Sequence, residues 1–229
     1  MKYFYVEYRF HRYPKRYLKG LINEIAHEFR VKGALKHRPV PHMTLYGPSQ
    51  ARSLDSVFSK IEKVAKRYTL VPFVVCDFDA HNGKGEKTIA CRIDASAELK
   101  NLRRELAAEL NRIVKISDRQ PWDNEDNYWF HTTIATKDID RKYDQILRYL
   151  SGIQKPNITQ HLVRITVLNN RREIEREYDL MFKRWLSRAE ALDKRLWRKT
   201  VNKLRESQGL PPERPLSLIE WFKKIFRFG

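Results

Sequence analysis

The sequence predicts an α+β fold with two lobes, on three observations. Segments of alternating apolar and polar residues, typical of strands, take turns with segments of helical period over residues 1–182. Two turn-forming stretches, 82–85 and Asn169-Asn170, each join two strand-like segments into a hairpin. A helix, a short strand, a second helix and a hairpin follow one another twice. We therefore expect two pseudo-symmetric βα-containing repeats whose antiparallel sheets line a central cleft.

The first half opens with the alternating segment 2–10, whose aromatic and aliphatic residues predict a strand. Leucine, isoleucine and phenylalanine then recur at helical spacing until Gly33, which predicts the end of a helix. In order we expect a strand, a helix, a strand, a helix and a hairpin, at residues 2–10, 14–32, 40–45, 54–68, and 70–78 with 87–93. The hairpin would place Cys76 and Cys91 opposite each other, and we expect both thiols to be free in a reducing compartment.

The second half repeats this order. The predicted elements are a helix, a strand, a helix and two hairpin strands, at residues 97–114, 128–135, 138–150, 158–168 and 172–181. From residue 183 onward lysine and arginine far outnumber acidic residues, and we expect a basic helical extension over 183–229, with helices at 185–206 and 216–228. The predicted organisation is thus a bilobal domain, 1–182, and a C-terminal extension.

The net charge of the chain indicates what kind of partner it binds. The net charge of +18 favours a polyanionic partner, first of all nucleic acid. No apolar stretch is long enough to span a bilayer, and the N-terminus lacks the features of a signal peptide, which predicts a cytoplasmic protein. The final helix is amphipathic and basic. It could contact an anionic membrane or a protein, although we favour packing on the chain itself.

Two His-x-Thr motifs carry the chemistry. Alternate residues of a strand point the same way, so His42 and Thr44 share one face, as do His131 and Thr133. If the two repeats face each other, two imidazoles and two hydroxyls meet at one site. One histidine could remove a proton from a nucleophile while the other donates one to the leaving oxygen. The hydroxyls could bind phosphate oxygens. This chemistry needs no cofactor and no metal.

The motifs carry a family resemblance. Pro41-His42-Met43-Thr44-Leu45 and Phe130-His131-Thr132-Thr133-Ile134 resemble the paired motifs of the 2H phosphoesterase superfamily. Within it, residues 1–182 are most similar to the 2'-5' RNA ligase / RNA 2',3'-cyclic phosphodiesterase group. The resemblance implies a bilobal fold, an RNA partner and catalytic roles for these histidines and threonines. It also implies hydrolysis of a 2',3'-cyclic phosphate to a 2'-phosphate, with 2'-5' ligation as a related activity.

Three further residues are predicted to contact substrate. Tyr46 continues the face of the first motif and Trp129 that of the second, so each could stack on a nucleobase or form part of the wall. Lys137 stands after the second motif, where similar proteins often carry an arginine, and could contact a phosphate. The alternatives are hydrolysis of 2'-5'-linked oligonucleotides or small cyclic nucleotides, and a non-catalytic RNA-binding module. In each case we expect a monomer.

Overall fold

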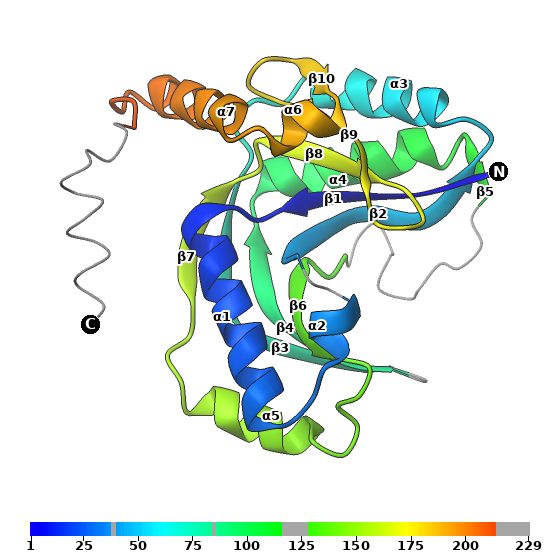
Figure 1. Cartoon of the computed structure of the whole chain (residues 1–229). Helices are drawn as coiled ribbons and strands as arrows, with labels where there is room; N and C mark the ends of the chain where they lie inside the picture. Colours follow the sequence, from blue (N-terminus) through cyan, green and yellow to red (C-terminus); the bar gives the residue numbers. More distant parts are fainter. Residues whose placement is uncertain (38–39, 84–85, 116–127, 214–229) are drawn as a thin grey trace.

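The computed structural model describes residues 1–37, 40–83, 86–115 and 128–213. Its strands form two antiparallel sheets, and its helices pack against them (Figure 1). The predicted α+β class with antiparallel sheets is confirmed. Within these ranges, no helix combines the length and the apolar character that crossing a bilayer requires. The final helix predicted at 216–228 lies outside the described residues.

The larger sheet contains six strands in the order β10-β9-β8-β1-β2-β5. Its bounds are β10 (Arg184–Leu186), β9 (Ile174–Asp179), β8 (Arg164–Leu168), β1 (Lys2–Arg9), β2 (His42–Ala51) and β5 (Val114–Lys115). The first His-x-Thr motif begins β2, which therefore lies beside the N-terminal strand β1. Strand β2 is longer than predicted, because it continues through the cis Gly47-Pro48 peptide to Ala51.

The smaller sheet has the order β6-β4-β3-β7. Its bounds are β6 (His131–Thr136), β4 (Glu86–Ala95), β3 (Pro72–Gly83) and β7 (Asn157–His161). The second motif begins β6, at the edge of this sheet. The predicted strand at 158–168 is wrong as a single element. It divides at Leu162 and Val163 into β7 and β8, which belong to different sheets.

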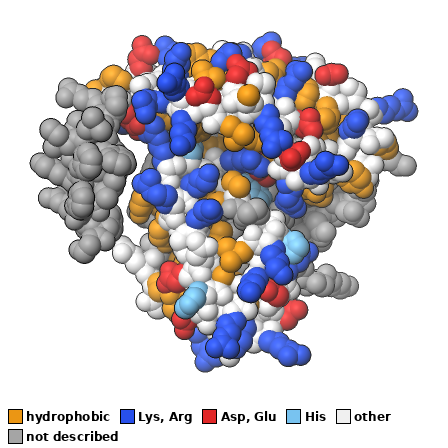
Figure 2. All heavy atoms as spheres, in the orientation of Figure 1, with side chains coloured by type: hydrophobic (Ala, Val, Ile, Leu, Met, Phe, Trp, Pro, Cys, Tyr) orange, Lys and Arg blue, Asp and Glu red, His pale blue; other side chains and the backbone are white. Residues whose placement is uncertain are grey.

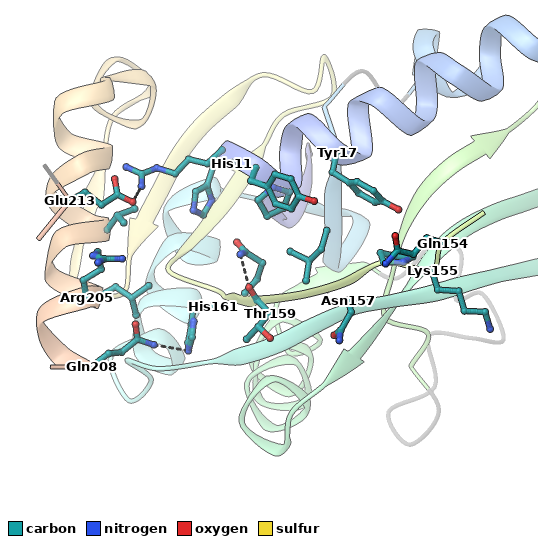
Figure 3. Close-up of a pocket in the computed structure, with 18 residues that line it drawn as sticks. His11, Tyr17, Gln154, Lys155, Asn157, Thr159, His161, Arg205, Gln208 and Glu213 are labelled. Atoms are coloured by element: carbon teal, nitrogen blue, oxygen red, sulfur yellow. Dashed lines mark hydrogen bonds and ion pairs between the residues drawn. The ribbon is translucent and has the colours of Figure 1, made fainter. Parts of the chain in front are cut away.

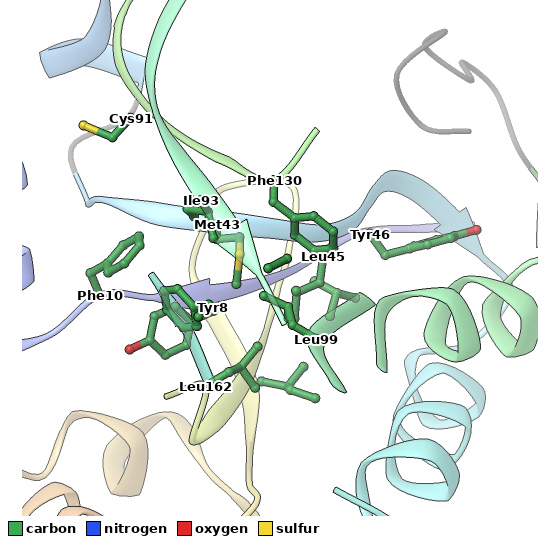
Figure 4. Close-up of a cluster of buried hydrophobic side chains, with 14 of the residues drawn as sticks. Tyr8, Phe10, Met43, Leu45, Tyr46, Cys91, Ile93, Leu99, Phe130 and Leu162 are labelled. Atoms are coloured by element: carbon green, nitrogen blue, oxygen red, sulfur yellow. The ribbon is translucent and has the colours of Figure 1, made fainter. Parts of the chain in front are cut away.

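Helices hold the two sheets in place. Helices α1 (Arg12–Glu28), α2 (Gly33–His37) and α5 (Tyr143–Ser151) pack on the smaller sheet. Helices α3 (Leu54–Ala65) and α4 (Ala97–Leu110) pack together beside β2. Between the sheets lies an apolar core, in which Met43 and Leu45 of β2 point toward Ile93 and Phe130 (Figure 4). This core fixes the position of both motif strands.

The predicted cysteine pairing is shifted by a bulge. Cys76 lies opposite Arg92 and Cys91 lies opposite Phe78, because Asp77 adds a residue to β3. Asp77 has a φ of 44°, and its carboxylate accepts a hydrogen bond from the Phe78 amide. The extra residue puts the two cysteines on opposite faces of the sheet, and both thiols are free.

The C-terminal extension is built into the larger sheet. The helix predicted at 185–206 is wrong at its start, because Trp185 and Leu186 belong to the edge strand β10. Two helices follow, α6 (Arg188–Leu192) and α7 (Lys194–Ser207), each with its own N-cap, Ser187 and Asp193. Residue 183 is therefore not a structural boundary between the sheet and the extension.

A buried polar network attaches α7 to the sheet. The Arg164 guanidinium, 2% exposed, donates to Glu177 Oε1 at 3.0 Å, to Asp179 Oδ2 at 3.2 Å and to Thr200 Oγ1 at 2.5 Å. Thr200 lies on α7 and in turn donates to Asp179. Burial raises the pKa of Glu177, while Arg164 opposes that rise. A buried charge is stable only when such partners are present, so α7 completes the fold of β8 and β9.

We predict that Thr200→Val destabilises the protein by about 1–3 kcal/mol. Valine keeps the shape of threonine but removes the hydroxyl, which leaves Arg164 and Asp179 each short of a partner. Urea denaturation with an unchanged slope would measure the loss. The exposed Thr159→Val, on β7, is the control, with an expected change within about 0.5 kcal/mol. Equal midpoints for both variants would show that this network does not hold α7.

Candidate active site

The first motif occupies one face of β2. Met43 and Leu45 are fully buried on the core side, while His42 and Thr44 are half-buried on the opposite face. Strand β1 pairs Glu7 with Thr44 and Arg9 with His42. Residues directly opposite in an antiparallel pair point to the same face. The two charged side chains of β1 therefore lie on the face of the first motif.

The second motif has the same construction on β6. Thr132 and Ile134 are buried, while His131 and Thr133 are half-buried. Strand β4 pairs Arg92 with His131 and Ala90 with Thr133. In both motifs, the residues of the buried face fix which way the histidine and threonine point.

Both histidines make the same hydrogen bond. His42 Nδ1 lies 2.8 Å from the carbonyl oxygen of Val40, and His131 Nδ1 lies 2.8 Å from that of Trp129. A carbonyl oxygen can only accept, so in each ring Nδ1 carries the proton and donates it. Nε2 is then the atom that gains or loses a proton, as a general acid or base requires.

The two motif strands lie side by side although they belong to different sheets. Strands β2 and β6 are in contact, and the start of β6 lies near the start of β2 (Figure 1). The Tyr128 hydroxyl donates to the main-chain oxygen of Thr44 at 2.8 Å. The Tyr128 ring also packs on Arg103, with the guanidinium carbon 3.8 Å from the ring centre. The hydrogen bond from Tyr128 to Thr44 connects the segment that leads into the second motif with the first motif.

A buried carboxylate adjoins the first histidine. Glu7 is 3% exposed, and its Oε2 lies 3.8 Å from His42 Nε2. Its other oxygen accepts from Arg9 Nε at 2.7 Å, and Arg9 also donates to the main-chain oxygen of Arg172 at 3.3 Å. A carboxylate at this distance favours the protonated form of an imidazole.

Tyr46 was predicted to continue the face of the first motif, and this is wrong. The pairing of β1 with β2 shifts between Val6 and Glu7, so Tyr46 lies opposite Val6, on the core side. Its ring is 7% exposed and stacks on Phe4, with 6.2 Å between centroids. Its hydroxyl donates to Asn111 at 2.7 Å. The extra residue at Leu45 turns Tyr46 inward, a shift that strand alternation alone cannot reveal.

Trp129 contacts the second histidine directly. The two rings stack with centroids 3.8 Å apart and an interplanar angle of 18°. The indole Nε1 donates to Asp79 Oδ2 at 2.8 Å, which holds the ring in place. One face of the indole is thus covered by His131, so Trp129 fixes the orientation of that imidazole.

Lys137 follows β6 and is exposed, with a φ of 75°. The turn that contains it packs closely on α2. The Asp138 carboxylate accepts from the amides of Lys32 and Gly33 at 2.7 and 2.9 Å. A Cβ on Gly33 would lie 1.9 Å from the Thr136 oxygen, so only glycine fits there. Whether Lys137 contacts substrate stays a prediction.

Two charged residues of this site were not foreseen. Glu7 and Arg9 lie at the polar positions of the first strand, where solvent exposure is the usual explanation. Their place beside His42 depends on the pairing of β1 with β2. In the described parts of the chain, no group of three or more His, Cys, Asp or Glu residues could hold a metal ion.

With this geometry established, comparison with known proteins identifies the family. The model of the 2'-5' RNA ligase superfamily matches residues 14–173, which include both motifs. The chain belongs to this superfamily. Its members are phosphoesterases and ligases. The resemblance to the 2H phosphoesterase superfamily, predicted from the two motifs, is confirmed. Comparison with curated proteins gives no match.

Solved structures show weaker likeness. Escherichia coli LigT complexed with 3'-AMP has 13% identity and a TM-score of 0.46, and the match covers 73% of this chain and 87% of that one. Kluyveromyces marxianus Usb1 has 10% identity and a TM-score of 0.43, covering 72% and 92%. A structure described as a phosphoesterase has 14% identity and a TM-score of 0.42, covering 73% and 87%.

We predict that Trp129→Leu lowers kcat by about tenfold, or ~1.4 kcal/mol of transition-state stabilisation, with little change in KM. Leucine removes both the stacking on His131 and the bond to Asp79, which leaves the imidazole less well oriented. Trp129→Phe keeps an aromatic ring and should lose less. Steady-state kinetics separate the two constants. A rise in KM with unchanged kcat would instead make Trp129 a platform for the nucleobase.

Proposed function

We propose that this member of the 2'-5' RNA ligase superfamily is a metal-independent phosphoesterase acting on RNA 3' ends, which opens a 2',3'-cyclic phosphate to a 2'-phosphate. The observation that carries the proposal is the shared hydrogen bond of His42 and His131 to a main-chain carbonyl. It gives two imidazoles whose Nε2 atoms can exchange protons, on two strands in contact. The match to the 2'-5' RNA ligase superfamily supports RNA as the class of substrate.

The roles of the two histidines follow from Glu7. Because its carboxylate favours a protonated His42, we assign His42 as the general acid and His131 as the general base. His131 takes a proton from water, and the water oxygen bonds to phosphorus. The bond from phosphorus to the ribose 3'-oxygen breaks, and His42 gives its proton to that oxygen. Thr44 and Thr133 donate hydrogen bonds to the non-bridging oxygens as negative charge develops.

The direct test is incubation of an RNA bearing a 2',3'-cyclic phosphate with the protein in EDTA, followed by mapping of the product as 2'- or 3'-phosphate. We expect the 2'-phosphate, and loss of turnover by at least about 100-fold in His42→Ala and in His131→Ala. Thermal unfolding of each variant would show whether the fold is kept. Near-wild-type rates in either variant would rule out the two-histidine mechanism. RNA binding without turnover in the wild type would favour a binding module.

The assignment of acid and base makes a separate prediction about pH. Removal of the carboxylate in Glu7→Gln makes protonation of His42 less favourable, so the group that must be protonated loses its proton at lower pH. The alkaline limb of kcat/KM should therefore move to lower pH by about one unit, with the acid limb unchanged.

The matched control is Glu28→Gln, an exposed carboxylate at the end of α1. It removes the same charge far from the site and should leave both limbs in place. Movement of the acid limb in Glu7→Gln would instead make His42 the base. If neither limb moved, Glu7 would have no influence on the reacting imidazole.

A further inference from the structure

A groove between α1 and α7 begins near the candidate active site. It has a volume of about 670 Å³, and its walls are the first turns of the two helices, with Arg9, Arg164 and Thr166 at its floor. We call it the α1–α7 groove. A smaller pocket adjoins it, because Arg9 and Val40 line both, and this pocket also contains Glu7, His42 and Arg172. The groove therefore leads to His42.

Cations line this groove. Lys15 and Arg16 of α1 face it together with Lys194 and Arg198 of α7, and all four are exposed. No carboxylate in the described ranges lies within ion-pair distance of any of the four. In Figure 2, lysine and arginine side chains gather between α7 and the beginning of α1. Four cations without counter-charges along one groove attract a polyanion.

Nearby positive charges, together with burial, lower the pKa values of groups at the start of α1. Burial and then the charges of Arg198 and Arg205 lower the pKa of Arg12. Burial, followed by Lys19 and Arg9, lowers that of Lys15. For His11, burial and then Arg12 lower the pKa to about 3, so this imidazole stays neutral. The cations thus repel one another, and bound phosphates would relieve the repulsion.

A second groove provides a contrast (Figure 3). It has a volume of about 730 Å³ and lies between α1, β7 and the C-terminal half of α7. Its cations have partners: Arg12 pairs with Glu213, Lys155 pairs with Asp77, and Arg205 donates to the Pro211 oxygen. Carboxylates therefore neutralise Arg12 and Lys155, and this groove is the weaker choice for a phosphate backbone.

One wall of the α1–α7 groove lies beyond the family match. The match ends at residue 173, whereas Lys194, Trp197 and Arg198 belong to α7. Trp197 packs over the Arg164 guanidinium, 4.3 Å from its ring centre, so the buried network that attaches α7 also fixes this wall. The extension therefore adds a surface that lies outside the residues matched by the family model.

We propose that the α1–α7 groove binds the phosphate backbone of single-stranded RNA upstream of the 3' end held at His42. This inference rests on the proposed function and names its substrate as an RNA chain of several nucleotides. Lys15, Arg16, Lys194 and Arg198 contact phosphates without reading sequence. Discrimination between a polymer and a free cyclic nucleotide then comes from the α1–α7 groove, to which the extension contributes Lys194 and Arg198.

The test compares two substrates with the same cyclic end, a dinucleotide and a 12-nucleotide RNA. In Lys15→Gln/Arg198→Gln, KM for the 12-nucleotide RNA should rise about tenfold at 100 mM salt, and the salt slope of binding should fall by roughly two. The dinucleotide should keep its kcat and KM within about twofold. The control, Arg52→Gln/Lys100→Gln, removes two exposed cations outside the groove and should change neither substrate.

Equal effects on both substrates would overturn the proposal, as would an unchanged KM for the longer RNA. If the wild type turns over neither substrate, the proposed function fails, but binding of RNA by the groove can still be tested.

Fluorescence anisotropy with a 12-nucleotide RNA ending in a 3'-hydroxyl measures the affinity of each variant for RNA without any turnover. Weaker binding in the groove variant and not in the control would support the groove alone. Identical affinities would exclude it.

Discussion

The hydrogen bond from each histidine Nδ1 to the carbonyl two residues earlier is the interaction on which this site depends. It sets the tautomer of His42 and His131 alike and leaves Nε2 as the atom that exchanges protons. It forms because the main chain enters β2 and β6 in the same way. The buried residues Met43 and Ile134 then hold the opposite faces in the core. Two strands from different sheets thus present equivalent imidazole–hydroxyl pairs.

The symmetry between the motifs is broken by their neighbours. His42 lies beside a buried carboxylate that is itself held by Arg9, whereas His131 stacks on an indole held by Asp79. One environment favours the imidazolium, and the other orients a ring by packing. Acid and base chemistry need two histidines that differ in this way. The difference arises from residues outside the motifs.

The extension serves the fold and the charge of the molecule together. Buried Arg164 joins two carboxylates of β9 and the hydroxyl of Thr200, so the sheet and α7 stabilise each other. Once α7 is fixed, its lysine and arginine side chains lie across from those of α1. A basic surface then adjoins the smaller pocket of His42.

Much of this architecture could be predicted from sequence. Hydrophobic periodicity predicted most of the strands and helices, and alternation correctly put His42 with Thr44 and His131 with Thr133 on half-buried faces. The failures have local causes. The extra residue at Leu45 reversed Tyr46, and a crossing between sheets divided the strand at Leu162. Glu7 could not be assigned to the site, because strand pairing is a long-range property that periodicity does not contain.

In the proposed mechanism, His42 and His131 act as one catalytic unit. Measurement of kcat for His42→Ala, His131→Ala and the double variant on one cyclic-phosphate RNA would show whether they do. Residues that act as a unit give non-additive losses. We expect the double variant to be no slower than the slower single variant, within about twofold. A double variant slowed by the product of the two single losses would show that the histidines act independently and not as one unit.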